Sequence, residues 1–218
     1  MTDHILGRRH FLSSAAAVSL AAGGSVLPGQ DAAARRMPRV CVYTEHFQSL
    51  PIPEVCRLFQ QLGVDGLDLT VRPGGHIKPG EVKARLPLAV KAARDHGLEI
   101  MMLTTGITGP GRVAEETLAA CQAAGINRIK LGYYPLGEFG NLARRLDEVR
   151  RELESVVELA SKYEVRPCVH VHSGGTIPSS GWMLLDLIRR MPADRVGAYL
   201  DSYHMTITGG AGGWSQAI

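Results

Sequence analysis

The stretch Val64-Asp-Gly-Leu-Asp-Leu-Thr-Val71 decides the fold class, because it is a short apolar run of strand length with turn residues on both sides. Before it, Gly63 closes a helical pattern over 52–62 that Pro51 and Pro53 open. Proline at the start and glycine at the end are the usual limits of a helix. The stretch is therefore a strand joined to a helix, the unit from which α/β folds are built.

The same unit recurs along the chain. Strand patterns begin near positions 39, 64, 98, 126, 165 and 196, and helical patterns cover 52–62, 80–96, 111–124, 141–163 and 179–191. Strands that alternate with helices in this way form a parallel sheet.

Two parallel architectures fit this alternation, a doubly wound open sheet and a (β/α)8 barrel. No strand is followed by a G-x-G-x-x-G or G-x-x-x-x-G-K-[ST] loop, which removes the main support for a nucleotide-binding sheet. Polar side chains gather instead where the strands end, which is the place of the active site in a barrel. We therefore predict an α/β fold of the (β/α)8 TIM-barrel type, truncated to about six βα units.

The expected truncation follows from length, since residues 37–218 fall short of the roughly 250 residues of a typical eight-unit barrel. An unclosed barrel leaves its first and sixth strands as unpaired edges, which favours aggregation. We interpret the chain as a truncated product or a fragment, with completion by another chain as the alternative.

Residues 1–36 are typical of an export signal. Arg8 and Arg9 stand directly before a weakly hydrophobic stretch over 11–27, and Ala32-Ala-Ala34 offers small residues to a signal peptidase. The pattern resembles a twin-arginine (Tat) signal peptide with a linker, and the stretch is too short and polar to span a membrane stably. It predicts a periplasmic or otherwise exported protein whose barrel domain occupies 37–218.

Composition excludes several classes of protein. With 45% hydrophobic and 21% charged residues, the chain has the balance of one globular domain, and its four cysteines contain no C-x-x-C pair for a zinc ribbon or redox site. The formal charge of +3 falls to +1 without the four Arg and two Asp of residues 1–36. No basic run remains, so we expect no nucleic-acid partner.

Alternation with a period of two places His170 and His172 on one face of the fifth strand, opposite Val169 and Val171. The valines suit the helix-covered side, so the imidazoles point into the barrel mouth, where an H-x-H pair commonly holds one metal ion. The same alternation aims Asp201 of the sixth strand at this mouth. We predict that Asp201, His170 and His172 bind a divalent metal and that the two histidines are catalytic. Histidines satisfied by hydrogen bonds in a polar core are the alternative.

Four further side chains are candidates for substrate binding: Arg72, His76, Lys130 and His204. Arg72 and His76 follow the second strand, and Lys130 lies near the end of the fourth. His204 follows the sixth strand in a predicted loop. A salt bridge within its loop is the alternative role for Arg72.

Three motifs carry a family resemblance: Gly63-Val-Asp-Gly-Leu-Asp-Leu69, the His170-Val-His172 strand, and Asp201-Ser-Tyr-His204 followed by Gly209-Gly210. Together they resemble the sugar phosphate isomerase/epimerase family with the xylose-isomerase-like TIM barrel, over essentially all of 38–218. Relatives of this kind bind a divalent metal through Glu, Asp, His and Glu on the fifth to eighth strands, and the two Glu serve as acid and base. The resemblance implies that Asp201 is the sixth-strand ligand and that His172 and His204 occupy neighbouring polar positions.

His170 stands where the family has its fifth-strand Glu. A neutral imidazole binds a metal but is a different base from a carboxylate, so the proton-transfer chemistry is not simply inherited. The seventh and eighth strands, with the remaining His and Glu, are not among the six units counted.

The leading hypothesis is a metal-dependent sugar (phosphate) isomerase or epimerase that moves a proton at a carbonyl/hydroxyl pair of a small carbohydrate. The metal is manganese, magnesium or zinc, and the sequence leaves its identity, the sugar and the oligomeric state open. One alternative is a non-catalytic, degenerate carbohydrate-binding barrel. Another is an endonuclease-IV-like metal-dependent hydrolase, which the near-neutral charge and export signal disfavour.

We expect that replacing Arg8 and Arg9 together by Lys abolishes export, because the Tat pathway depends on the paired arginines before a weak hydrophobic stretch. Fractionation of cells that express the full chain measures this. The domain should keep the circular dichroism spectrum of the unmodified protein, and normal periplasmic accumulation of the variant would exclude a Tat signal.

Overall fold

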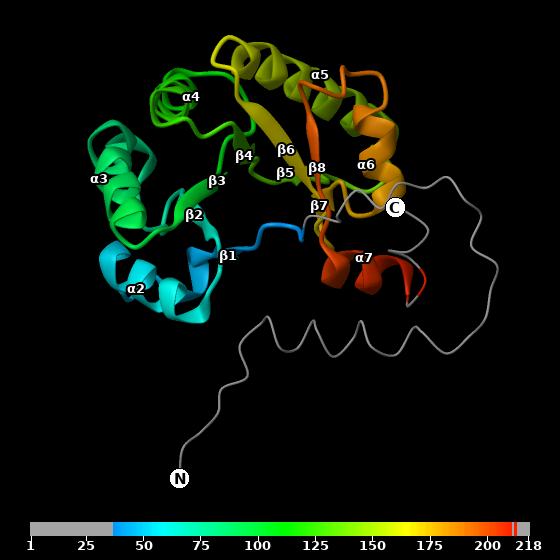
Figure 1. Cartoon of the computed structure of the whole chain (residues 1–218). Helices are drawn as coiled ribbons and strands as arrows, with labels where there is room; N and C mark the ends of the chain where they lie inside the picture. Colours follow the sequence, from blue (N-terminus) through cyan, green and yellow to red (C-terminus); the bar gives the residue numbers. More distant parts are fainter. Residues whose placement is uncertain (1–36, 211, 213–218) are drawn as a thin grey trace, which may run out of the picture.

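The computed structural model describes residues 37–210 and 212, and six parallel strands form its central sheet. The expected signal peptide lies outside the described residues. In sheet order the strands are β1 (Cys41–Tyr43), β2 (Gly66–Val71), β3 (Glu99–Thr105), β4 (Arg128–Lys130), β6 (Arg166–His170) and β8 (Gly197–Tyr199). Sheet order follows chain order, and the sheet curls like part of a barrel wall with helices outside it (Figure 1). The predicted TIM-barrel type with six βα units is confirmed.

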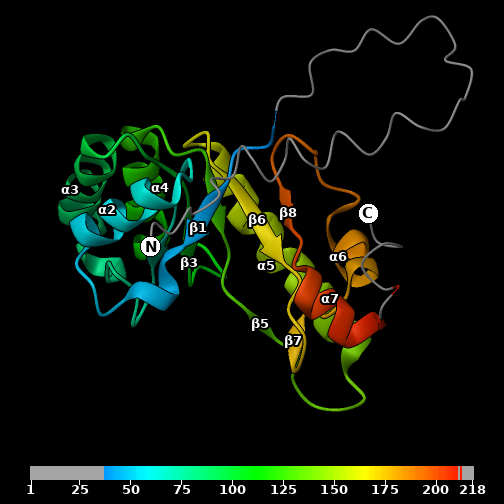
Figure 2. The same ribbon diagram turned by 60° about the horizontal axis from the view of Figure 1, so that its bottom comes forward.

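Helices connect the strands. They are α2 (Ile52–Leu62), α3 (Val82–Asp95), α4 (Arg112–Ala124), α5 (Leu142–Ser161), α6 (Gly181–Ile188) and α7 (Ser202–Gly209), with two 3-10 turns, η1 (Thr44–Phe47) and η2 (Pro79–Glu81). Figure 2 shows α7 beyond the end of β8, far from α2 to α4 on the other side of the domain. No helix among the described residues is long and apolar enough to cross a membrane.

The core lies between the sheet and the helices. Leu67, Leu69 and Val71 alternate along β2 and are almost completely buried in a cluster with Phe59 of α2 and Leu86 of α3. Burying side chains of this size stabilises the fold by about 1.5–3 kcal/mol each. The intervening residues of β2 face the concave side. The pleat therefore places polar side chains on this side and core side chains on the other.

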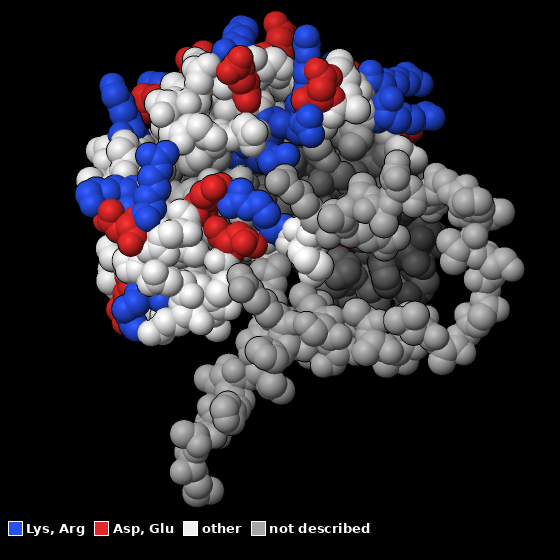
Figure 3. All heavy atoms as spheres, in the orientation of Figure 1, with Lys and Arg blue, Asp and Glu red and all other residues white. Residues whose placement is uncertain are grey.

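Ion pairs lie on the exposed faces of the helices. Lys91 and Asp95 lie 2.6 Å apart on α3, and Arg112 and Glu116 lie 2.7 Å apart on α4. On the face in Figure 3, basic and acidic side chains lie next to one another. Helical pairs of this kind contribute only about 0.3–0.5 kcal/mol each. Packing against the sheet therefore holds the helices.

Three details differ from the sequence prediction. The first strand begins at Cys41 rather than near position 39, and it ends at Tyr43, where the chain turns into η1. The helix expected over 179–191 is the shorter α6, which begins after Ser180, whose hydroxyl accepts the Met183 N–H at 3.2 Å. A two-stranded antiparallel pair, β5 (Tyr134–Pro135) with β7 (Thr176–Ile177), was not expected, since strands this short have no periodicity to detect.

We expect Gly66→Ala to destabilise the domain by about 1–3 kcal/mol, because a Cβ at this position would overlap the Glu99 carbonyl oxygen and press on the Met101 side chain. The matched control is Gly80→Ala, where a Cβ meets nothing within 4 Å. Urea denaturation of the two variants measures the difference. Equal midpoints would show that β2 and β3 can separate at Gly66 without cost.

Candidate functional site

The ends of β6 and β8 bring three candidate residues together. His170 is the last residue of β6 and pairs in register with Tyr199 of β8. Asp201 follows β8 and His204 lies one turn into α7. Parallel pairing therefore joins side chains that are 31 residues apart, at the carboxyl end of the sheet where barrels place their sites.

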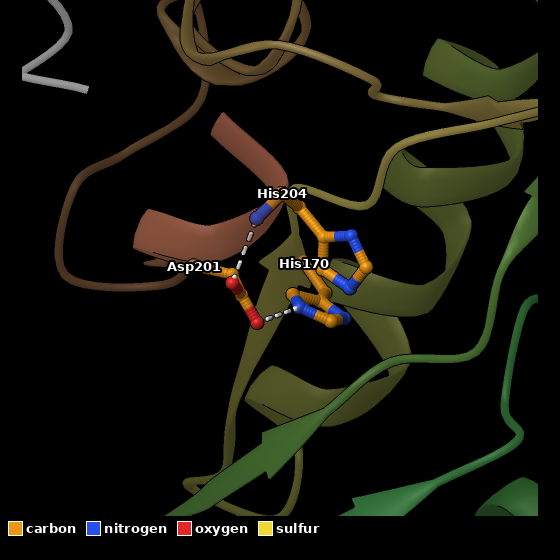
Figure 4. A group of neighbouring side chains, drawn as sticks. All are labelled: His170, Asp201 and His204. Carbon is orange, nitrogen blue, oxygen red and sulfur yellow. Dashed lines mark hydrogen bonds and ion pairs between the residues drawn. The ribbon is translucent and has the colours of Figure 1, made fainter. Parts of the chain in front are cut away.

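Asp201 contacts both His170 and His204. One carboxylate oxygen accepts the backbone N–H of His204 at 3.0 Å, and the other lies 3.3 Å from Nε2 of His170 (Figure 4). The first contact makes Asp201 the N-cap of α7, a role for which aspartate is among the favoured residues. His204 therefore lies in a helix, and its predicted loop position was wrong because the capping by Asp201 starts a helix there.

Three more contacts orient His204 and His172. Nδ1 of His204 lies 2.8 Å from the hydroxyl of Ser173, and the rings of His172 and His204 have centroids 3.9 Å apart. The ring of Tyr133 lies beside His172, with centroids separated by 4.6 Å. The H-x-H strand, α7 and the segment after β4 thus build one aromatic-lined group.

The donor atoms fit a divalent metal. One ligand atom from each of His170, Asp201 and His204 lies within 4.8 Å of the other two. Nδ1 of His170 and Nδ1 of His172 are buried and have no hydrogen-bond partner among the described residues. Two imidazoles and one carboxylate are a donor set for zinc, manganese or iron rather than for magnesium, which prefers oxygen.

The protonation states of these side chains also suit metal binding. Burial, followed by the nearby charge of Lys130, lowers the pKa of His170 to about 4, so its imidazole is neutral near pH 7. Burial and the adjacent His204 lower the pKa of His172. Burial alone would raise the pKa of Asp201, but the hydrogen bonds from His204 and His170 outweigh it and lower the pKa. Neutral imidazoles beside a carboxylate are the forms that bind a metal.

Lys130 lies on the concave face next to this group. Its side chain is 3% exposed, and its Nζ lies 3.8 Å from the centroid of the Tyr133 ring. Burial, and then the charge of Arg72, lower the pKa of Lys130 to about 8. The predicted substrate residue is therefore a buried amine beneath an aromatic ring.

Arg72 and His76 are held by other protein groups. The Arg72 guanidinium forms an ion pair with Glu45 at 2.5 Å, so the loop salt bridge considered from the sequence is present. Nε2 of His76 lies 3.1 Å from the Phe47 carbonyl, which can only accept, so Nε2 carries the proton and Nδ1 accepts from the hydroxyl of Thr70 at 3.1 Å. Both ring nitrogens of His76 are thereby used, and His76 joins the second strand to η1.

Sequence reasoning missed Tyr133 and Ser173 as members of the group. Tyr133 stands three residues after Lys130 in the Tyr133-Tyr134 pair, which reads as the end of a strand rather than as a site. Ser173 directly follows the H-x-H strand, and a hydroxyl next to two expected ligands is the signal that could have found it.

A comparison with protein families matches residues 56–217 to the model described as xylose isomerase-like TIM barrel. The chain belongs to the xylose isomerase-like TIM barrel family. No curated protein sequence matches it significantly.

Several solved sugar epimerases share its fold. A 3-keto-D-glucoside 4-epimerase from E. coli aligns with a TM-score of 0.63 at 16% identity, over 81% of this chain and 72% of that one. A D-psicose 3-epimerase from Clostridium cellulolyticum H10 aligns at 0.60 and 13%, over 77% and 64%, and an L-ribulose 3-epimerase at 0.61 and 14%, over 79% and 63%. The chain spans less than two thirds of the latter two, and identities this low show the fold alone.

Asp68 lies deeper in the barrel wall than the histidine group. Its two oxygens accept from Thr104 at 2.8 Å and from Tyr199 at 3.3 Å. Burial outweighs these hydrogen bonds and raises its pKa from 3.8 to about 6. The native state therefore binds a proton more readily than the unfolded chain, and ionisation of Asp68 lowers the free energy of unfolding as the pH rises from about 4 to about 6.

We expect Asp68→Asn to gain stability relative to the unmodified protein as the pH rises from 4 to 7, by up to about 3 kcal/mol, because an amide does not ionise. Urea denaturation at several pH values measures this, and exposed Asp194→Asn serves as the control. A constant difference across this pH range would show that the Asp68 carboxylate is stabilised by its partners.

Proposed function

We propose that this protein is a divalent-metal-dependent epimerase or isomerase of small carbohydrates. The observation that carries the proposal is the cluster of His170, Asp201 and His204 donor atoms within 4.8 Å, at the carboxyl end of a barrel sheet. Membership of the xylose isomerase-like TIM barrel family and the fold shared with several sugar epimerases support the substrate class.

The metal would be held by His170, Asp201 and His204, with His172 as a further imidazole beside them. A bound divalent cation polarises a carbonyl or hydroxyl oxygen and so acidifies the neighbouring C–H bond. A solved family member from Mycobacterium smegmatis contains magnesium. The two imidazoles of this chain favour zinc or manganese instead.

The protein's own residues supply orientation and proton acceptors. Ser173 fixes the ring of His204 through Nδ1, and Asp201 fixes the ring of His170. His172 has an unpartnered Nδ1 within the described residues and a lowered pKa, so it can accept a proton near neutral pH. Tyr133, 38% exposed, lines the approach to this group.

We expect Asp201→Asn to weaken binding of zinc and manganese at least about tenfold, or about 1.4 kcal/mol, because the amide lacks the carboxylate charge. The Asn oxygen can still cap α7, so the free energy of unfolding should change by less than about 1 kcal/mol. Calorimetric titration measures the affinities. The matched control is Asp68→Asn, an inward carboxylate whose oxygens are already used by Thr104 and Tyr199. Equal affinities in all three proteins would remove Asp201 from the site.

Proton transfer is tested separately from metal binding. The metal-loaded protein is incubated with D-tagatose, D-psicose or L-ribulose in D2O, and deuterium at carbon is followed by NMR. Exchange that is lost in Asp201→Asn supports the proposal. Tight metal binding without exchange on any sugar would favour a non-catalytic carbohydrate-binding barrel, and cleavage of a phosphodiester would favour the hydrolase.

A further inference from the structure

Lys130 is a buried lysine on the concave face of the sheet. It is the last residue of β4 and pairs in register with Thr104 on one side and Cys168 on the other, so it faces the concave side of the sheet. Its side chain is 3% exposed, and its Nζ has no hydrogen-bond partner among the described residues. A buried lysine amine is costly unless it is paired or neutral, so this position calls for a ligand or a chemical role.

The nearby carboxylates are already used. Asp68 accepts hydrogen bonds from Thr104 and Tyr199, and Glu45 is paired with Arg72 and with the hydroxyl of Tyr43 at 3.1 Å. Neither forms an ion pair with Lys130. Four other titratable side chains among the described residues face Lys130: Arg72 after β2, Tyr133 after β4, His170 at the end of β6, and His172 just after it.

These surroundings increase the neutral fraction of the Lys130 amine. Arg72 is a second cation that opposes a charge on Lys130, whereas the ring of Tyr133 and the more distant carboxylates favour the charge. The balance lowers the pKa of Lys130 to about 8. Near pH 7 about 10% of such amines are neutral, against about 0.03% of an ordinary lysine, a ratio of roughly 300.

Tyr133 connects Lys130 to the candidate metal group. Its ring lies 3.8 Å from Nζ on one side, and its centroid lies 4.6 Å from the ring of His172. The ring is 38% exposed, so it forms the layer between the amine and the mouth of the site. The same ring therefore contacts both the amine and the candidate metal group.

We propose that Nζ of Lys130 is a nucleophile that forms an imine with the carbonyl carbon of the substrate in this site. The inference rests on the proposed function in one respect, that the ligand is a carbohydrate with a free carbonyl group. Desolvated lysines beside a second cation are the kind that form Schiff bases.

The step balances without an oxidant or reductant. The neutral amine adds to the carbonyl carbon to give a carbinolamine, and the former carbonyl oxygen leaves as water while a C=N bond replaces the C=O bond. The protonated imine withdraws electrons from the adjacent C–H bond, whose proton an epimerase must move. Water then hydrolyses the imine, which restores the lysine and releases the sugar.

Reductive trapping tests the proposal on the unmodified, full-length protein. The probe is dihydroxyacetone, the smallest ketose, with sodium cyanoborohydride at pH 7. We expect one predominant modification, at Lys130, with a mass gain equal to the probe minus one oxygen atom. Peptide mapping by mass spectrometry should show Lys130 trapped roughly 100-fold or more faster than exposed Lys78.

Variants of Lys130 distinguish the role of its amine as a nucleophile from the role of its positive charge. Lys130→Arg keeps the cation but not the nucleophile, and Lys130→Met removes both, so neither should be trapped at this position. Lys78→Arg is the matched control and should be trapped like the unmodified protein. Tyr133→Phe keeps a ring over the amine, so Lys130 should be trapped in this variant as in the unmodified protein.

Trapping confined to exposed lysines would overturn the proposal, and so would full proton exchange on D-tagatose by Lys130→Arg. Proton exchange without trapping at Lys130 rejects the imine and leaves the proposed function intact. Selective trapping at Lys130 without exchange on any sugar supports the imine and rejects epimerisation.

Discussion

Parallel pairing in a continuous register is the constraint on which the rest of this structure depends. Thr104, Lys130, Cys168 and Gly197 are partners across four consecutive strands, so every second residue of each strand faces the same concave side. The opposite side carries the leucines and valines that pack against the helices. The pleat alone thus divides the sheet into an apolar face that provides stability and a polar face that provides chemistry.

The concave face bears charged groups at two depths. Asp68 and Lys130 lie within the wall, where burial raises one pKa and lowers the other, and both shifts favour neutral forms. His170, Asp201 and His204 lie at the strand ends, where α7 turns over them. Each shift brings the pKa of a buried group closer to neutral pH, so both protonation states of Asp68 and of Lys130 are accessible beneath the candidate metal donors.

Asp201 couples fold and site through its two carboxylate oxygens. One caps α7 and the other meets His170, so the helix that carries His204 begins where the metal donors converge. The family resemblance implies a Glu where His170 stands, and an imidazole in its place favours metals that prefer nitrogen ligands. In the proposed mechanism His172 is then the proton acceptor, and Lys130 is the nucleophile.

The sequence by itself determined the six-unit alternation, the inward face of β6 and the presence of Asp201, His170 and His172 at strand ends, because periods of 2 and 3.6 are local properties of the chain. It did not determine that both ring nitrogens of His76 contact Thr70 and the Phe47 carbonyl, that His204 lies in the first turn of a helix, or that the ring of Tyr133 covers Lys130. Those outcomes depend on contacts between residues distant in sequence or on the competition between a cap and a loop. Only the tertiary structure brings such partners together, so only it decides which polar side chain is structural and which is left without a partner.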